Sequence, residues 1–292
     1  MLRLAVATER QTFERMRGPL GERGIEVAHL PSRERSIRLT EPPTREFDAG
    51  FVYPPRLMEG GALDALYDIP WVNGRRAVLT SRNKAGVVAA LSRAGIPVPE
   101  TRMVSNPADE SDVYDAVDGL EFPVVVKPNS TTRGVGVAKA SDVDSLLGVV
   151  DYLNLVHDYR ATGDKSYLVQ EFLPDARDYR VMVVDGTVVG GVERRLSAAA
   201  LEEGRWKHNV HRGASAVGID VRPEHRRLAA SVAETLDISY LGVDLLETGA
   251  RTVVSETNAR PTIDDAAKYE DGFWDRLAAT IRETAGVEDC RD

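Results

Sequence analysis

Apolar residues recur along the first hundred positions with the spacing of alternating strands and helices. Residues 2–7 (LRLAVA) and 25–30 (IEVAHL) predict strands, and residues 9–22 between them predict a helix. A third strand is expected over 48–53, and a short helix after the glycine pair at 60–61. The chain therefore opens with a β-α-β pattern, which is typical of an α/β lobe.

The next apolar pattern, over residues 76–94, has helical spacing and predicts one amphipathic helix. Gly95 is expected to close this helix, and Pro97 to prevent its continuation, because proline lacks the amide hydrogen that a helix needs. We expect a boundary here, so that an N-terminal α/β domain covers residues 1–97.

Short apolar runs dominate the rest of the chain. The segments FPVVVKP and SYLVQEF predict strands, with a helical stretch around 142–160. After Arg180 the pattern is again rich in strands, followed by a helix at 223–236, the hairpin LGVDLLETGARTVVSETN and a terminal helix at about 272–285. We expect a central subdomain over residues 98–180 and a C-terminal subdomain over residues 181–292.

Composition and charge narrow the classes of function. The 292 residues are 42% hydrophobic and 28% charged, which is ordinary for a folded protein. The net charge of −9 argues against nucleic acid or an anionic membrane surface as the main partner. The lone Cys290 excludes an internal disulfide and a cysteine-rich metal site. Since neither a signal peptide nor a membrane span is recognisable, we expect a cytoplasmic protein.

The hairpin near the C-terminus brings oxygen atoms together on an otherwise apolar pair of strands. A three-residue loop, GAR, would pair Thr248 with Thr252 and place Asp244 opposite Glu256. Glu256 and Asn258 are two positions apart, so their side chains point to one face of the strand. Two carboxylates and a carboxamide suit magnesium. The alternative is that these are exposed polar residues at the end of a strand.

The stretch FPVVVKPNSTTRGVGVAKA predicts a strand, a glycine-containing loop and a second strand. Lys127 ends the first strand, and Gly134 and Gly136 let the loop backbone approach a ligand, where successive amide groups can bind phosphate oxygens. It is not a Walker A loop, because Lys127 precedes the loop, and not a Rossmann fingerprint, because the glycines lead into a strand. The alternative is a plain turn.

Two further segments carry polar groups that suit a ligand. In YLVQEFLPDARDYRVMVV, an apolar strand ends at Gln170–Leu173, where backbone groups beside an apolar wall can hold a flat heterocycle and the Asp178 carboxylate a ribose. In GRWKHNVHRGAS, the pair His208 and His211 suggests zinc, but no third soft ligand is nearby. A cationic pocket for phosphate or carboxylate is favoured over zinc, with a solvated charged loop as the alternative.

The order of these motifs closely resembles that of the ATP-grasp amide ligases. The resemblance is most specific at SRNKAGVVAALSRAGIPVPET, VQEFLPDARDYRVMVV, NVHRGA and GVDLLE…SETNARP, and within the superfamily it is to the RimK-like glutamate ligases, which extend ribosomal-protein tails or archaeal coenzymes. It implies a mixed α/β (α+β) ATP-grasp fold with an N-terminal α/β lobe, a small central lid and a C-terminal β-sheet lobe, with ATP between the last two.

The resemblance also implies a role for each motif. Contacts to the nucleotide are implied for Lys84 and Lys127 at the phosphates, Thr132, Arg133, Gly134 and Gly136 in the closing loop, the backbone of Gln170, Glu171, Phe172 and Leu173 at adenine, and Asp178 at the ribose. Neutralisation of the transferring phosphoryl group and the acyl-phosphate is implied for Lys207, Asn209 and Arg212. Asp244, Glu256 and Asn258 match the family's magnesium ligands, with manganese as the alternative metal.

The activity implied is the ATP-dependent joining of L-glutamate to a carboxylate acceptor through an acyl-phosphate, with release of ADP and phosphate. After Asn258 the chain reads Ala-Arg-Pro-Thr, whereas the RimK-like pattern often continues with a small residue, Pro and Gly, so the acceptor stays open. Another amino acid, a protein or peptide acceptor, a nucleotide-binding regulator without turnover and a kinase-like reaction are the alternatives. Whether the chain forms a homo-oligomer is also left open.

Overall fold

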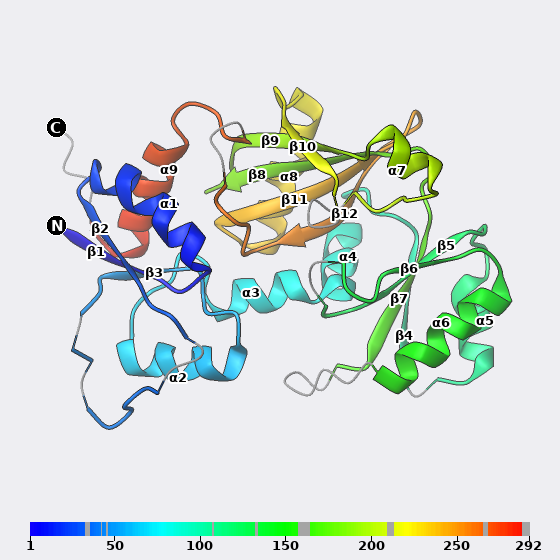
Figure 1. Cartoon of the computed structure of the whole chain (residues 1–292), viewed down its shortest axis with the longest axis horizontal. Helices are drawn as coiled ribbons and strands as arrows, with labels where there is room; N and C mark the ends of the chain where they lie inside the picture. The colour runs from blue at the N-terminus through cyan, green and yellow to red at the C-terminus, as the bar shows by residue number, and fades with distance from the viewer. Residues whose placement is uncertain are drawn as a thin grey trace.

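Three β-sheets follow one another along the chain (Figure 1). The computed structural model describes residues 1–32, 36–41, 43–44, 46–106, 108–131, 134–156, 164–208, 213–264 and 268–287. No helix within these ranges has both the length and the apolar character needed to cross a membrane. The domain boundaries expected at residues 97 and 180 stay predictions.

The first sheet is parallel, with the strand order β2-β1-β3, and it confirms the β-α-β opening. Its elements are β1 (Leu2–Val6), α1 (Arg10–Gly21), β2 (Ile25–His29), β3 (Ala49–Phe51) and α2 (Leu57–Tyr67). Helix α2 begins earlier than expected and contains both glycines of the 60–61 pair. The reason is close packing, because a Cβ atom on Gly60 would lie 2.8 Å from the ring of Tyr53.

The single helix expected over 76–94 is in fact two helices, α3 (Arg75–Arg82) and α4 (Lys84–Arg93). Asn83 separates them, and its side-chain oxygen accepts a hydrogen bond from the Gly86 amide at 3.0 Å, which caps the second helix. The break sets Lys84 at the first position of α4. Gly95, with φ of +73°, takes the left-handed conformation expected of it.

The second sheet is antiparallel, with the strand order β4-β7-β5-β6. Its elements are β4 (Thr101–Ser105), α5 (Glu110–Val117), β5 (Val124–Pro128), β6 (Ala138–Ala140), α6 (Val143–Val156) and β7 (Ser166–Glu171). The strands expected in FPVVVKP and SYLVQEF are confirmed as β5 and β7. Strand β4 and helix α5 go beyond the sequence-based expectation, and the expected helix is described as far as residue 156.

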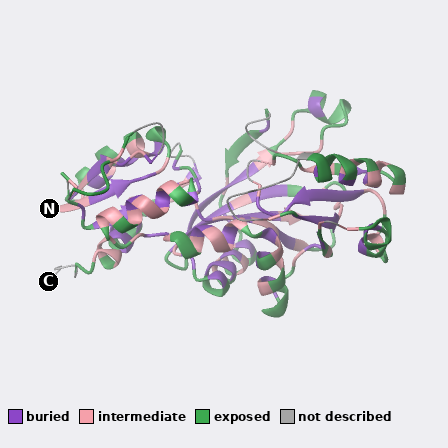
Figure 2. Ribbon diagram, turned by 90° about the horizontal axis from the view of Figure 1, so that it is seen from below, coloured by how far each residue is buried: buried purple, intermediate pink, exposed green. Residues whose placement is uncertain are grey.

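The third sheet is antiparallel and has the strand order β10-β9-β8-β11-β12. Its elements are β8 (Arg177–Val184), β9 (Thr187–Arg195), α7 (Ala198–Glu202), β10 (Ser215–Gly218), α8 (Pro223–Leu236), β11 (Tyr240–Glu247) and β12 (Thr252–Asn258), followed by α9 (Phe273–Thr284). The expected helices at 223–236 and 272–285 are confirmed within one residue at each end. Figure 2 shows the strands of this sheet as largely buried.

The two faces of the third sheet pack against different parts of the chain. On one face Val181 and Val183 join the core formed with α4 and α8, and we call this the back face. On the other, Met182 and Val184 join the core of the first sheet and α9, and we call this the front face. The terminal helix α9 thus returns to the N-terminal lobe, where it lies against α1 and β3 (Figure 1).

The hairpin of β11 and β12 reaches the expected pairing by an unexpected route. The expected three-residue loop is wrong, because Glu247, not Thr248, pairs with Thr252. A bulge between Asp244 and Leu245 then shifts the register by one residue, so that Asp244 does lie opposite Glu256. The loop error and the bulge cancel, and the two carboxylates share the front face.

Candidate active site

Two lysines from different elements converge on Glu256. Lys84, at the start of α4, lies with its Nζ atom 3.2 Å from Glu256 Oε1 and also donates to the carbonyl of Thr131. Lys127, on β5, donates to Gln170 Oε1 at 2.9 Å. Both lysines are buried, whereas the Glu256 side chain is 39% exposed. Residues from the second and third sheets therefore meet at one cationic site.

The ammonium of Lys127 is poorly compensated in this arrangement. Burial lowers its pKa to about 8, the carboxylate of Glu256 opposes this shift, and the nearby charge of Lys84 adds to it. An additional anion next to Lys127 would restore the balance. Phosphate oxygens of a nucleotide are such an anion, so the geometry suits the role expected for both lysines.

Beside this pair, the front face carries a buried network of charges around Asp244. Arg180 donates to both carboxylate oxygens of Asp244, from Nε at 2.6 Å and from Nη2 at 2.7 Å. Arg194 lies 3.0 Å from Asp244 Oδ2 and donates from Nε to Asp178 Oδ1 at 2.7 Å. Two guanidinium groups thus hold two carboxylates, and the network spans three adjacent strands.

The two carboxylates of this network have opposite pKa shifts. Burial alone would raise the pKa of Asp244, but the guanidinium groups of Arg180 and Arg194 outweigh it and hold the pKa at about 2. Burial raises the pKa of Asp178 to about 7, because Arg194 compensates it only in part and the charge of Asp244 opposes ionisation. The ribose role of Asp178 stays a prediction, and a ribose hydroxyl would have to share that carboxylate with Arg194.

Arg180 and Arg194 are not among the site residues expected from sequence, although both side chains contact Asp244. Their signal is strand alternation: Arg180 is two positions after Asp178 and is paired across the strands with Asp244. Arg180 could have been found from sequence by pairing β8 with β11 and marking every second residue of β8 as facing the same side as Asp244.

The glycine-containing loop lies between β5 and β6. Gly134 and Gly136 have positive φ values of 66° and 76°, and a Cβ atom on Gly136 would lie 2.7 Å from Pro128 Cγ. Lys207 donates a hydrogen bond from Nζ to the carbonyl of Val137, which joins the third sheet's long loop to the second sheet. The expected site residues Thr132, Arg133, Asn209 and Arg212, together with His211, lie outside the described residues.

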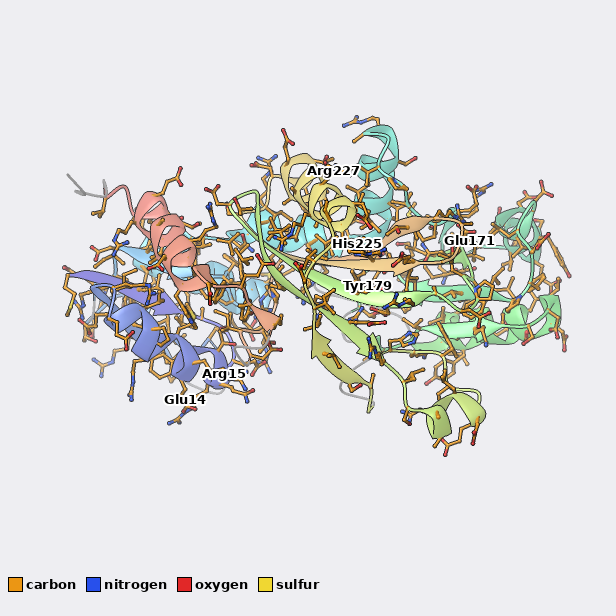
Figure 3. The ribbon with its side chains drawn as sticks, turned by 90° about the horizontal axis from the view of Figure 1, so that it is seen from above. Glu14, Arg15, Glu171, Tyr179, His225 and Arg227 are labelled. Atoms are coloured by element: carbon orange, nitrogen blue, oxygen red, sulfur yellow. The ribbon has the colours of Figure 1, made fainter. Side chains whose placement is uncertain are left out.

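The segment expected to hold adenine, residues 170–173, consists of the last two residues of β7 and the two residues after it. The ring of Phe172 stands nearly perpendicular to that of Trp206, with 5.8 Å between centroids, and Lys139 Nζ lies 4.8 Å from the Phe172 centroid. The Glu171 carboxylate, labelled in Figure 3, accepts from Arg251 at 2.6 Å, and half-buried Leu173 follows in the chain. Aromatic walls with backbone groups beside them suit a flat heterocycle.

The metal ligands expected from sequence fit magnesium in type and position. Asp244 and Glu256 are cross-strand neighbours, and Asn258 lies on the same face. The Asn258 side-chain oxygen accepts from the Arg260 amide at 2.9 Å, which fixes its orientation. Asp244 would have to exchange part of its arginine contacts for the cation. Among the described residues no cluster of three or more His, Cys, Asp or Glu side chains that could hold a metal is present. The zinc alternative includes His211, which lies outside these residues.

Comparison with known proteins agrees with this arrangement. Residues 81–272, well over half of the chain, match the RimK-like ATP-grasp domain. The chain belongs to the RimK-like ATP-grasp family. This RimK-like chain is 33% identical over 199 residues to the ribosomal protein bS6–L-glutamate ligase of Escherichia coli O139:H28, a match over 68% of the chain. It spans 62% of the length of the curated relatives it matches.

Solved structures confirm the ATP-grasp fold for the whole RimK-like chain. A RimK domain protein of Sphaerobacter thermophilus matches with a TM-score of 0.69 and 23% identity, over 97% of this chain and 98% of that one. D-alanine–D-alanine ligase from Bacillus anthracis matches with a TM-score of 0.71 and 19% identity, over 98% and 97% of the two chains. The same ligase is known in complex with ATP, the nucleotide that the ATP-grasp ligase family uses.

Proposed function

We propose that the chain is an ATP-dependent ligase that joins the amino group of L-glutamate to a substrate carboxylate. The observation that carries the proposal is the pair of cross-strand carboxylates, Asp244 and Glu256, set among four cations from four elements. These cations are the buried Lys84 and Lys127 and the partly buried Arg180 and Arg194. Burying so many charges does not by itself stabilise a fold. The cations match the negative charge of a nucleoside triphosphate, and the carboxylates match the metal that accompanies it.

The two lysines and the two arginines have different roles, which follow from their positions. Lys84 and Lys127, on the side of the second sheet, hold the nucleotide phosphates, and the glycine-containing loop covers them. Arg180 and Arg194, next to Asp244, lie where a substrate carboxylate and the transferred phosphoryl group meet. Guanidinium groups suit this position because they bind carboxylate or phosphate with two parallel hydrogen bonds.

Magnesium would be held by Asp244, Glu256 and Asn258. When bound, it offsets the charge that spreads over the phosphoryl oxygens during transfer. Arg180 and Arg194 balance Asp244 without the metal, so their release from that carboxylate makes them available to the substrate at the same moment. The arginines and the metal thus share one carboxylate.

The reaction proceeds in two steps. A carboxylate oxygen of the acceptor attacks the γ-phosphorus of ATP, ADP leaves with the electron pair of the broken bond, and an acyl-phosphate remains. The ammonium group of glutamate then loses a proton, the resulting amine attacks the acyl carbon, phosphate leaves, and the nitrogen loses a second proton to give the amide. Water would destroy the intermediate, which is why the loop between β5 and β6 must close during turnover.

The choice of glutamate follows from the relatives. The Escherichia coli relative is named for joining L-glutamate to ribosomal protein bS6, and the Citrobacter koseri relative is named a probable alpha-L-glutamate ligase. We carry L-glutamate and a carboxylate acceptor over to this chain. A different amino acid or a peptide acceptor is the alternative that the segment after Asn258 keeps open.

The test is an incubation with magnesium, ATP, L-glutamate and purified bS6, analysed for ADP and by mass spectrometry. The proposal expects ADP together with acceptor heavier by one or more glutamyl units. Replacing glutamate with hydroxylamine should trap the acceptor as a hydroxamate, which a kinase-like reaction cannot give. If a panel of carboxylate acceptors yields no ADP although ATP binds, the ligase proposal is wrong and a nucleotide-binding regulator takes its place.

A further inference from the structure

The described residues that follow Asn258, 259–264 and 268–270, include two that lie against the front face of the third sheet, Pro261 and Lys268. A Cβ atom on Gly242 would be 3.5 Å from Pro261 Cβ and 3.7 Å from Arg180 Cδ. At the other end, a Cβ atom on Gly190 would be only 2.1 Å from the carbonyl oxygen of Lys268. Both glycines therefore let the segment press against the strands, and it passes directly beside Arg180.

This segment carries a buried lysine that the proposed chemistry does not yet use. Lys268 Nζ donates to the carbonyl of Thr262 at 3.1 Å and to Asp264 Oδ1 at 3.0 Å, which accounts for two of its three N–H donors. Burial lowers the pKa of Lys268, Asp264 opposes this, and the charge of Arg180 adds to it. Lys268 lies against Gly190, which pairs with Met182 on the front face, two positions along β8 from Arg180.

The carboxylate partner of Lys268 is open to solvent. The side chain of Asp264 is 46% exposed, against 8% for that of Lys268. From the N-terminal lobe, Arg15 on α1 donates from Nη1 to the carbonyl of Ile263 at 2.8 Å and holds the segment in place (Figure 3). The pair therefore presents opposite charges where the N-terminal lobe meets the front face.

We infer that Lys268 and Asp264 bind the amino-acid substrate as a zwitterion, with its carboxylate on Lys268 and its ammonium group on Asp264. The inference rests on the proposed function and names the residues that recognise the amine-donating substrate. ATP occupies the side of Arg180 that faces Lys84 and Lys127, so the amine must reach the acyl carbon from the other side. The segment with Lys268 covers that side.

The charges favour an amino acid over the acceptor as the ligand. The α-carbon of glutamate at neutral pH carries one carboxylate and one ammonium group, and a lysine next to an aspartate complements both of these groups. A carboxylate acceptor has no positive group for Asp264, and its reacting carboxylate belongs with Arg180 and Arg194. An unpaired ligand carboxylate at Lys268 would also supply the acceptor for its third donor.

The test measures L-glutamate affinity by calorimetry, with magnesium and a non-hydrolysable ATP analogue present, and the KM for glutamate in turnover. Lys268→Met, which keeps the length of the side chain and removes its charge, should weaken glutamate binding or raise the KM at least tenfold. Lys268→Arg should recover part of the loss, and Asp264→Asn should show a smaller loss. Affinity for the ATP analogue should stay within twofold in every variant.

Two matched controls separate substrate recognition from a general loosening of the segment. Glu270 anchors the same segment to α8 through Arg226, at 3.1 Å, so Glu270→Gln should loosen it without changing glutamate affinity. Gly190→Ala should displace Lys268 and reproduce the loss, whereas Gly186→Ala adds a side chain at positive φ with no atom within 4 Å and should not. If the contact between Lys268 and Asp264 only stabilised the fold, Lys268→Arg would not be expected to recover glutamate affinity.

Hydroxylamine gives the decisive comparison, because it accepts the acyl group without needing an amino-acid site. Lys268→Met should lose amide formation but keep hydroxamate formation. Loss of both would overturn the inference and assign Lys268 to the acceptor, and unchanged glutamate affinity and KM would overturn it while the ligase stands. If the wild-type protein binds glutamate through Lys268 but makes neither ADP nor hydroxamate, the proposed ligase activity fails and the binding site stands.

Discussion

The third sheet carries a network of arginines and carboxylates on each of its faces, and the two networks share the strands β8 and β9. On the front face Arg194 pairs with Asp178 and Asp244, while on the back face its neighbour Glu193 pairs with Arg177 and Arg195. Tyr179 and His225, labelled in Figure 3, also belong to the back face, with their rings 4.8 Å apart. Strand alternation sends consecutive residues of one sequence into two different environments.

The difference between the two networks is exposure of the cations. On the front face the Arg194 and Arg180 side chains are 11% and 25% exposed, whereas on the back face Arg177 and Arg195 are 57% and 55% exposed. Exposed pairs are screened by water and salt and contribute little. Buried charges must be matched by some partner at all times, so a network of them can exchange a protein partner for a ligand.

The largest expected effect comes from removing the carboxylate at the centre of the front network. Asp244→Asn leaves Arg180 and Arg194 buried without their shared anion, and the free energy of unfolding should fall by about 3–5 kcal/mol. Urea denaturation followed by circular dichroism measures this loss. Ligase turnover should vanish as well.

A chain that keeps its stability after Asp244→Asn would contradict this view of the front face. The matched control is Glu247→Gln, on the same strand but with its carboxylate directed to Arg222 on the back of the sheet. Since the Arg222 side chain is 43% exposed, the control should cost about 1 kcal/mol or less.

Glu256→Gln should act more on turnover than on the fold. The two buried lysines lose a nearby carboxylate, but the Glu256 side chain is 39% exposed and its neutral isostere can still accept a hydrogen bond from Lys84. Loss of one charged group at the phosphoryl-transfer site typically costs about a hundredfold or more in rate. ADP release under saturating ATP and magnesium measures the effect, and a mutant rate equal to that of the wild type would remove Glu256 from the metal site.

Lys127, in the candidate active site, should make both ATP affinity and stability depend on pH. Its pKa is lowered to about 8, and bound phosphates favour its charged form, so ATP affinity should fall as pH rises through about 8. In the unfolded chain the pKa of Lys127 keeps its ordinary value of 10.5. Between about pH 8 and pH 10.5 this lysine is therefore more protonated in the unfolded chain than in the folded one. The free energy of unfolding without nucleotide should accordingly rise with pH over that range.

The control variant for this behaviour is Lys127→Met. This variant should weaken ATP binding about tenfold, because one partly compensated charge is lost. The ATP affinity that remains should no longer change near pH 8. Calorimetric titrations in buffers of different ionisation enthalpy measure the proton taken up on binding. A Lys127→Met protein that still takes up a proton near pH 8 would place the titration elsewhere.

The sequence predicted the order of the elements because apolar spacing and turn residues are local signals. The β-α-β opening, the strands β5 and β7 and the helices at 223–236 and 272–285 all followed from it, whereas the pairing of Asp244 with Glu256 was reached only because the bulge offsets the wrong loop. The break at Asn83 was not predicted, because the helical spacing of apolar residues continues through this position and hides the helix cap. Nor was the bulge beside Asp244, which depends on how β12 packs against both β11 and the chain at Pro97.

The centre of the site was less predictable than its edges. Lys127 and Glu256 stand in recognisable motifs, but Arg180 and Arg194 become site residues only through the order of strands β9, β8 and β11. Lys268 is still less accessible to sequence reasoning, since its burial depends on close contact with Gly190, far away in the chain. Residues whose role comes from tertiary packing carry no local signal.

The smallest expected effect completes the comparison on the back face. Hydrogen bonds from Arg177 and Arg195 lower the pKa of Glu193 to about 2, so its stabilising contribution is complete above the ordinary value of 4.5 and disappears as pH falls towards 2. Because both partners are more than half exposed, Glu193→Gln should cost about 1 kcal/mol or less at neutral pH. That cost should shrink further in 1 M salt, where the Debye length is about 3 Å, whereas the loss caused by Asp244→Asn should not. Equal salt sensitivity of the two variants would show that burial does not separate the two faces, and the case for an exchangeable front network would lose its physical basis.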